Sequence, residues 1–284
     1  MNENPVNYNS NKEDDDPILY FQNLDVSYLP SKNHDYEGIP ILQATNEELI
    51  TYSLQKIDEL RLRSPNKIEY VLSLDPYRYQ WLRRSKKFKQ LAQESFFNLP
   101  CGAGLMWMAK RYKSPIPERV STIRYTMNLL RLAQAKEYTV FIVGDKDEVL
   151  DKLFYNLRRS FPRLRLIGKH NGNLVKGAYE KVIEALKKTN PHIVLLGLGF
   201  HKELDWIAKN KTNIGSSLVI PVNGYLEILA GKNKKAPDSI ETKGLTWFYR
   251  AINRPWRWHR FYYIDIWFLG TYFRSIFKKK YRQK

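Results

Sequence analysis

The sequence has little cysteine and no long apolar run, and both absences exclude classes of protein. A single cysteine, Cys101, cannot form an internal disulfide or a zinc site, and it fits a reducing compartment. The longest apolar stretches, such as residues 193–200, fall short of the roughly 18 residues that indicate a membrane span. The polar, acidic N-terminus is typical of neither a signal peptide nor a transit peptide. With 43% hydrophobic and 27% charged residues, the chain has the composition of a globular protein.

Acidic residues are also scarce relative to basic ones. The 284 residues include 47 Lys and Arg against 29 Asp and Glu, a formal net charge of +18. This excess predicts a polyanionic partner, which could be nucleic acid, an anionic membrane or a phosphorylated substrate. The charge is uneven, because the N-terminus is acidic and the C-terminus is basic and rich in aromatic residues. We therefore predict an acidic, largely disordered segment 1–35, an α/β domain 36–240 and a basic C-terminal appendage 241–284.

Strand-like and helix-like segments alternate between these ends. Thr45-Asn-Glu-Glu48 is a capping box, which predicts a helix from there to about Arg63. The patterns predict further helices at 80–94, 102–112, 120–135, 147–160 and 175–188, and strands at 69–73, 139–144, 165–167, 192–198 and 218–222. Continuous apolar strands separated by helices indicate a Rossmann-like α/β fold, with a mostly parallel sheet covered by helices on both faces. Ligands bind such sheets beyond the carboxyl ends of the strands, so the loops there are the candidate site.

Seven sequence blocks in and around these loops occur in one order. They are Gly38-Ile-Pro-Ile41 with the capping box, Ser73-Leu-Asp-Pro76, Leu99-Pro-Cys-Gly-Ala-Gly104, Pro117-Glu-Arg-Val120, Gly197-Leu-Gly199 with Lys202 and Trp206, Leu229-Ala-Gly-Lys232 with Lys235-Ala-Pro237, and Gly244-Leu-Thr-Trp-Phe-Tyr-Arg250. Together, from about residue 37 to 262, they resemble the WecG/TagA/CpsF glycosyltransferases. That family includes the N-acetylmannosamine transferases of teichoic-acid and enterobacterial common-antigen synthesis.

The resemblance implies an activity and a set of partners. It implies inverting transfer of a sugar, such as N-acetylmannosamine, from a UDP-sugar to a lipid-diphosphate-linked glycan acceptor in cell-surface polysaccharide synthesis. It implies no metal ion or other cofactor, and a location on the inner face of the bacterial cytoplasmic membrane. The basic C-terminal helical appendage would associate with that anionic surface and close over the site. A homo-oligomer stays open, and nucleic acid is not expected because no known nucleic-acid motif is present.

The resemblance also implies site residues, and this chain departs from the family pattern at the chemical centre. Ser73 takes the place of a Thr, Cys101 that of an Asp proposed as general base, and Glu203 that of a Gln. The candidate substrate-binding residues are Ser73, Gly102, Gly104, Lys202, Asn223, Gly224, Arg250, Arg257 and Arg260, of which Gly102 and Gly104 are candidates because they open a helix whose amide groups could bind phosphate. The three arginines match the family, and guanidinium groups bind diphosphate bidentately.

The substitution at Cys101 leaves the identity of the general base open. A thiol with a reference pKa of about 8.5 is mostly protonated at neutral pH and is a poor base. Cys101 is then either a modified catalytic group or an ordinary small buried residue. A relocated carboxylate from Asp75 or Glu203 could act instead, although Glu203 also fits a surface position at a helix start. The alternative function is a non-catalytic relative that binds nucleotide sugar or partner proteins.

A second motif invites a metal interpretation. Asp145-Lys-Asp147 has the D-x-D form with which other glycosyltransferases hold a metal and a nucleotide sugar. Here it follows a strand and opens a helix, so Asp147 is more simply the helix N-cap. His170, in the next strand-end loop, is expected to make a loop hydrogen bond rather than to act in catalysis.

Overall fold

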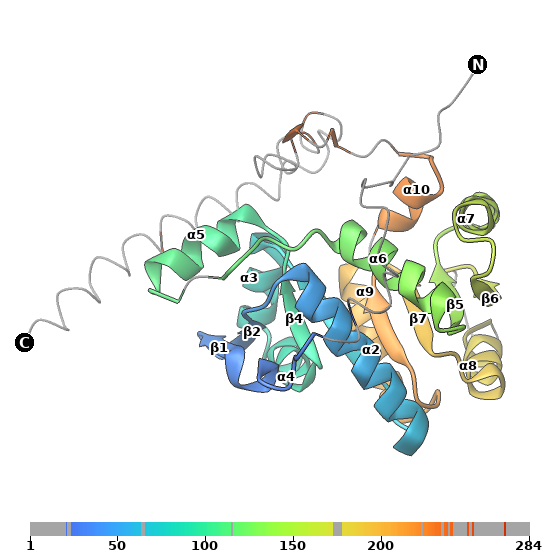
Figure 1. Ribbon diagram of the computed structural model, residues 1–284, viewed down its shortest axis with the longest axis horizontal. Coiled ribbons are helices and arrows are strands. Elements are labelled where there is room, and N and C mark those ends of the chain that lie inside the picture. Colours follow the sequence, from blue (N-terminus) through green and yellow to red (C-terminus); the bar gives the residue numbers. More distant parts are fainter. Residues whose placement is uncertain are drawn as a thin grey trace, which may run out of the picture.

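The computed structural model describes residues 21, 24–63, 66–114, 116–172, 178–222 and 224–233, together with residues 236–237, 239–240, 249, 252 and 270. Its strands are β1 (Asn33–Tyr36), β2 (Ile39–Leu42), β3 (Glu69–Leu74), β4 (Phe97–Pro100), β5 (Thr139–Gly144), β6 (Arg165–His170), β7 (Ile193–Gly197) and β8 (Leu218–Pro221). Its helices are η1 (Leu29–Lys32), α2 (Asn46–Arg63), α3 (Pro76–Arg84), α4 (Lys86–Glu94), α5 (Ala103–Arg111), α6 (Thr122–Ala135), α7 (Asp147–Ser160), α8 (Ala178–Thr189), α9 (Phe200–Asn210) and α10 (Tyr225–Leu229) (Figure 1).

Six strands form one sheet in the order β4-β3-β8-β7-β5-β6, and every neighbouring pair is parallel. This confirms the predicted parallel α/β fold. The parallel arrangement follows from the sequence, because each strand is joined to the next by at least one helix that returns the chain to the same end of the sheet. Consequently the loops after all six strands lie at one edge.

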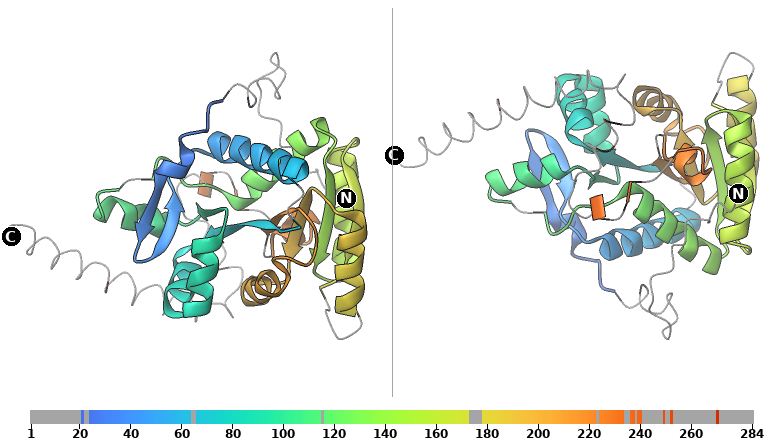
Figure 2. Two further views of the ribbon diagram at one scale, coloured as in Figure 1. Left: turned by 90° about the horizontal axis from the view of Figure 1, so that it is seen from below. Right: turned by 90° about the horizontal axis from the view of Figure 1, so that it is seen from above.

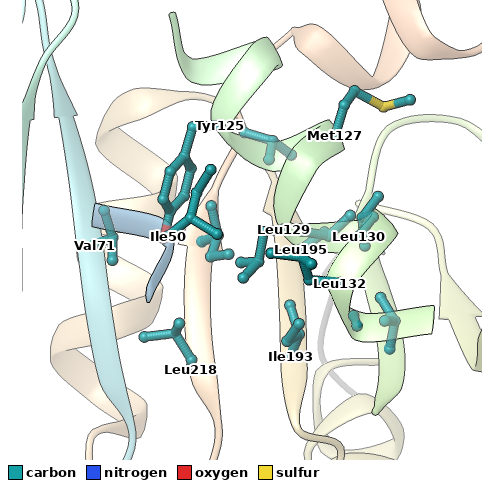
Figure 3. Packing of buried hydrophobic residues seen from close by; sticks show 14 of the residues in the cluster. Ile50, Val71, Tyr125, Met127, Leu129, Leu130, Leu132, Ile193, Leu195 and Leu218 are labelled. Carbon is teal, nitrogen blue, oxygen red and sulfur yellow. The ribbon is translucent and has the colours of Figure 1, made fainter. Parts of the chain in front are cut away.

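The sheet is the middle layer of three (Figure 2). Along β7, Ile193 and Leu195 belong to one apolar cluster and Val194 and Leu196 to the other, as the alternation of side chains along a strand requires. The first cluster packs against α2, α6, α7 and α10, and Figure 3 shows part of it. The second cluster packs against α3, α4, α5, α8 and α9. Helices therefore shield both faces of the sheet from water, which explains why the sequences of the central strands are continuously apolar.

The elements differ from the prediction in several places, and helices α9 and α10 were not predicted. The single helix expected at 80–94 is two helices, because Ser85 has an extended backbone (ψ 118°) and its hydroxyl caps α4 by accepting from the Phe88 N–H. The edge strand β4 was missed, since Phe97–Pro100 is too short to show a pattern. The β1–β2 hairpin was also missed, and its turn places Glu37 and Gly38 at positive φ. Within the segment expected to be largely disordered, Val26 and Leu29 are buried in the first cluster.

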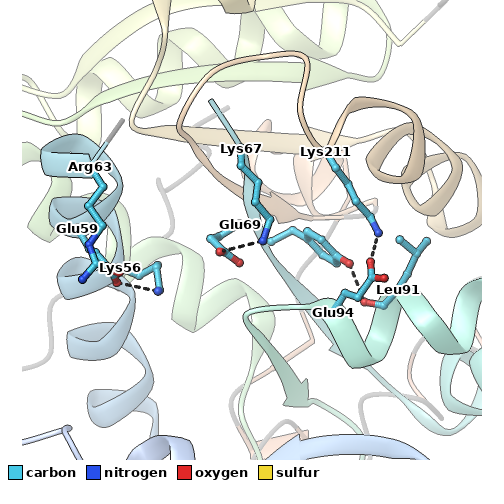
Figure 4. A network of polar contacts seen from close by, with 9 residues as sticks. Lys56, Glu59, Arg63, Lys67, Glu69, Leu91, Glu94 and Lys211 are labelled. Atoms are coloured by element: carbon cyan, nitrogen blue, oxygen red, sulfur yellow. Dashed lines mark hydrogen bonds and ion pairs between the residues drawn. The ribbon is translucent and has the colours of Figure 1, made fainter. Parts of the chain in front are cut away.

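The charged groups at the amino end of the sheet pair with one another (Figure 4). Lys67 lies 3.7 Å from Glu69 at the start of β3, and Lys211 pairs with Glu94. Tyr70 donates a hydrogen bond of 2.8 Å to the Leu91 carbonyl between these two pairs. Charges that neutralise one another in this way stabilise the scaffold and are poorly placed to bind a ligand.

His192 is a half-buried titratable group at the same amino end. Its Nδ1 accepts a hydrogen bond from the Thr139 N–H (3.1 Å), and its ring stacks on Tyr138 at 4.9 Å. Burial and the positive charges of Arg61 and Arg165 lower the pKa of His192 to about 4. The folded protein therefore holds this imidazole neutral at pH values where an unfolded chain protonates it.

We expect His192→Asn to make stability less dependent on pH. Because the pKa of His192 is lower in the folded than in the unfolded state, acid favours unfolding as pH falls from about 6.5 towards 4. An Asn oxygen can replace Nδ1 as acceptor from Thr139 without titrating. Urea midpoints at pH 7.5 and pH 5 should differ more for the natural chain than for the variant. An equal loss in both chains would contradict this prediction.

Candidate functional site

The order of the strands makes the chain connections that follow β5 and β7 diverge. From β5 the chain runs through α7 to the edge strand β6, whereas from β7 it runs through α9 to β8 in the middle of the sheet. Helices α7 and α9 pack on opposite faces. The loops after β5 and β7 therefore leave in opposite directions, and parallel α/β sheets bind ligands in the crevice at such a point.

A pocket of about 580 Å³ occupies this crevice. It is bounded by the loop after β5, the end of β6 and the segment that leads into α9, with the lining residues Asp145, Lys146, Asp147, Asn171, Gly172, Gly197, Leu198, Gly199 and Lys202. Its volume lies in the range of small-molecule sites. Of the residues predicted from the sequence, the pocket contains Lys202.

Glycines let the backbones that form this pocket approach one another closely. A Cβ atom at Gly144, where φ is +137°, would lie 2.4 Å from the Gly197 carbonyl oxygen. A Cβ atom at Gly172 would lie 3.0 Å from the Asp145 nitrogen, and the Gly172 N–H donates to the Asp145 carbonyl at 2.8 Å. Side chains at these positions would fill or distort the pocket, so its shape depends on their absence.

The polar groups of the pocket are held by local hydrogen bonds. The Asp147 carboxylate accepts from the Asn171 amide at 2.8 Å, so the α7 and β6 sides of the pocket are joined. The prediction that Asp147 is the N-cap was wrong by one residue, since Lys146 is the N-cap and Asp147 is the first residue of α7. His170 Nδ1 lies 2.7 Å from the Asn171 carbonyl oxygen, which is the expected loop contact.

A second group of side chains lies at the carboxyl ends of β3 and β4, and we call it the β3–β4 cluster: Ser73, Asp75, Arg78, Cys101 and Glu203. Asp75 follows β3 and caps α3, because its Oδ1 accepts from the Arg78 N–H at 2.8 Å. The Arg78 guanidinium then turns back over the strand end. Its Nη1 donates to the Ser73 carbonyl at 2.9 Å, and its Nε lies 3.6 Å from Asp75 Oδ2.

Cys101 is joined to the same strand end by backbone and side chain. Its N–H donates to the Leu74 carbonyl at 2.7 Å, and its Sγ lies 3.0 Å from the Thr122 hydroxyl. Burial raises the pKa of the Cys101 thiol, although the Thr122 hydrogen bond and the Arg78 charge oppose that rise. The group at position 101 is therefore a protonated thiol at neutral pH. This favours the interpretation of Cys101 as a packed side chain, which also contacts the first apolar cluster.

Gly102 brings the Cys101 loop against the start of α3. A Cβ atom at Gly102 would lie 2.6 Å from Pro76 Cδ and 3.2 Å from Asp75 Cα. The residue is also the N-cap of α5, and Gly104 lies in the first turn of that helix. The contact explains why two loops from neighbouring strands can bring Asp75 and Cys101 together.

Glu203 reaches the cluster from α9. Only 1% of the residue is exposed, so the alternative of a surface position at the helix start was wrong. Its Oε1 accepts from the Gly199 N–H at 3.3 Å, within the segment that also lines the pocket. Burial would lower the pKa of Arg78, but the neighbouring acidic groups, Asp75 foremost and Glu203 among them, raise it above its usual value. Arg78 is thus the cation that these groups share.

Arg78 is the residue of the cluster that sequence reasoning missed. Its guanidinium also lies 5.7 Å from the centre of the Phe200 ring, so it contacts α9 as well as α3. The sequence did contain a signal for this residue. Arg78 lies one helical turn after Asp75, which follows a buried strand, and this spacing places the two side chains on the same face of the helix.

Several predicted residues are not part of these two groups. Gly224 precedes α10 in a left-handed conformation (φ +42°), and no atom in the part of the chain that the structure describes lies within 4 Å of a Cβ placed there. Asn223, Arg250, Arg257 and Arg260 lie outside the described residues. Among the residues that the structure describes, no three His, Cys, Asp or Glu side chains gather where they could share a metal ion. Nor does any helix in that part of the chain combine the length and apolar character that crossing a bilayer requires.

Fold and pocket together define a doubly wound α/β protein with a pocket at its topological switch point. The chain belongs to the glycosyl transferase WecG/TagA/CpsF family, whose family model matches residues 35–282. Over 206 residues it is 24% identical to the N-acetylglucosaminyldiphosphoundecaprenol N-acetyl-beta-D-mannosaminyltransferase of Staphylococcus aureus strain NCTC 8325, which covers 71% of this chain and 80% of the relative. The protein of the same name from strain MRSA252 is 23% identical over the same shares. The predicted family is thereby confirmed.

Proposed function

We propose that the chain is a hexosyltransferase that moves an N-acetylmannosamine-like sugar from a UDP-sugar to a lipid-diphosphate-linked acceptor, with inversion at the anomeric carbon. One observation carries this proposal. The pocket at the switch point and the β3–β4 cluster share one segment, because Gly199 and Lys202 line the pocket while Glu203 binds Gly199 and faces Arg78. A donor bound there would place its nucleotide in the pocket and its sugar beside the cluster.

The pocket contains two lysines and two aspartates, and these groups can serve different parts of a nucleoside diphosphate. Lys146 and Lys202 supply positive charge for the diphosphate, and cations near a leaving group offset the negative charge that develops during transfer. The Asp147–Asn171 pair offers an acceptor and an amide to the hydroxyl groups of a ribose. The proposal assigns no metal ion, and it leaves Arg250, Arg257 and Arg260 as further candidates for the diphosphate.

The acceptor and the location follow from the relatives. Their name specifies an undecaprenol diphosphate that carries N-acetylglucosamine, and such a lipid is held in a membrane. We therefore place this chain peripherally at the inner surface of the cytoplasmic membrane, in cell-surface polysaccharide synthesis. The basic segment 241–284 would be attracted to anionic lipid there.

Reversing the charge of Lys202 should weaken nucleotide binding. A charge-assisted hydrogen bond contributes about 1.5–3 kcal/mol, so Lys202→Glu should raise the Kd for UDP at least about tenfold in titration calorimetry. Lys209→Glu is the matched control, because it makes the same charge change on the exposed side of the same helix outside the pocket. Equal affinities in both variants would count against the nucleotide assignment. Release of UDP only when a lipid-linked acceptor is added would separate transfer from mere binding.

A further inference from the structure

Three groups of the β3–β4 cluster could in principle take a proton, and they differ in access. Burial keeps the Cys101 thiol protonated, as its raised pKa shows. Glu203 is 1% exposed and is engaged with the segment beneath the pocket. Asp75 is the carboxylate with access, because 37% of its side chain is exposed at the carboxyl end of the sheet.

We propose that Asp75 is the general base of the transfer reaction and that Arg78 is the residue that positions it. This assignment rests on the proposed function, since a base is required only if a hydroxyl group attacks the donor. In the step, the acceptor oxygen bonds to the anomeric carbon while the bond from that carbon to the diphosphate oxygen breaks. The electron pair of the broken bond leaves on the diphosphate, and the hydroxyl proton passes to the Asp75 carboxylate and then to water.

The contacts with Arg78 fix the position of the Asp75 carboxylate and still leave it able to accept a proton. One oxygen accepts the Arg78 N–H as a helix cap, and the other lies 3.6 Å from Arg78 Nε. A carboxylate has about four lone-pair sites, so positions remain for an incoming hydroxyl group. The cap fixes the side-chain rotamer, which places the base at a defined point beside the Cys101 loop.

Arg78 is fixed in turn from several directions. The Ser73 carbonyl accepts from it, the Phe200 ring lies against it, and the charge of Glu203 acts on it. A guanidinium held in this way orients the neighbouring carboxylate and cannot itself accept a proton at neutral pH.

The decisive variant is Asp75→Asn. Asn caps helices as well as Asp does, so the fold should be retained, while the amide cannot accept the proton. We expect turnover to fall at least about 100-fold and the Kd for UDP to stay unchanged. Asp75→Ser, which also caps, repeats the test independently. Glu203→Gln, which keeps an acceptor for Gly199, should reduce turnover far less.

A carboxylate on the adjoining loop should restore part of the lost activity. Position 101 lies so close that the charges of Asp75 and Arg78 both act on its sulfur. The double variant Asp75→Asn, Cys101→Asp should therefore recover turnover at least about tenfold over Asp75→Asn, within the range that a positioned base contributes. Arg78→Gln should lower kcat with the donor KM unchanged, and Arg78→Lys should recover part of it; a purely structural role would give no such order.

The outcomes separate this assignment from the proposed function. If the natural chain releases UDP with acceptor and Asp75→Asn and Asp75→Ser do so equally fast, the base is not Asp75. If Glu203→Gln alone abolishes turnover, the base is Glu203. If the natural chain neither binds UDP nor transfers a sugar, the proposed function fails and the assignment of a base fails with it.

Discussion

Gly144→Ala is expected to destabilise the protein by about 3 kcal/mol or more and to abolish nucleotide binding, since backbone strain and overpacking each cost about 1–3 kcal/mol. The φ of +137° at Gly144 is a conformation that alanine rarely adopts. The added Cβ atom would also lie 2.4 Å from the oxygen and 2.7 Å from the Cα of Gly197. Both neighbours are backbone atoms, so β5 and β7 would have to separate at the floor of the pocket.

Gly199→Ala is the matched control, because it introduces backbone strain at a glycine with positive φ without the steric clash. Gly199 also has a positive φ, +89°, but a Cβ atom there would meet no atom of the described residues within 4 Å. Its cost should be about 1–2 kcal/mol, from strain alone. Urea unfolding gives both free energies, and titration of Gly144→Ala with UDP measures the loss of the pocket. Similar costs for the two variants would show that the close approach of β5 and β7 is not required.

Much of the fold could be predicted because the local signals agree with the tertiary arrangement. The capping box is formed as expected, with the Thr45 N–H donating to Glu48 at 2.7 Å and the Glu48 N–H donating to Thr45 at 3.3 Å. The central strands β5 and β7 are buried on both faces, so their sequences are apolar throughout. The break at Ser85 was not predictable from periodicity, since α3 and α4 read as one helix unless the serine is recognised as a cap.

The site was predictable in part, for a reason of topology. Strand-end loops of a parallel sheet must lie at one edge, so the sequence alone is enough to group Ser73, Asp75 and Cys101. The direction of a long side chain is a different matter. Whether Arg78 points to solvent or back over the strand depends on partners from α9 and α10, which are far away in the sequence. The burial of Glu203 has the same origin, because α9 packs that face of the helix onto the sheet.

Gly102→Ala should lower turnover about 100-fold while leaving the Kd for UDP nearly unchanged, because displacing a catalytic group by about 1 Å can cost that much. The new Cβ atom would lie 2.6 Å from Pro76 Cδ and 3.2 Å from Asp75 Cα. A proline ring cannot rotate away, so the start of α3 must move and carry the Asp75 carboxylate with it. The pocket at β5 and β7 lies on other loops and should keep its shape.

Gly231→Ala is a suitable control for this effect. Gly231 follows α10 at φ +73°, and among the described residues a Cβ atom there would meet only the Asn156 amide nitrogen, at 3.8 Å. It should therefore lose stability without a selective loss of kcat. Steady-state kinetics with the donor, together with calorimetry, distinguish the two cases. If Gly102→Ala instead weakens UDP binding and leaves kcat intact, the contact between the Cys101 loop and α3 positions the nucleotide and not the base. The roles assigned to the pocket and to the β3–β4 cluster must then be exchanged.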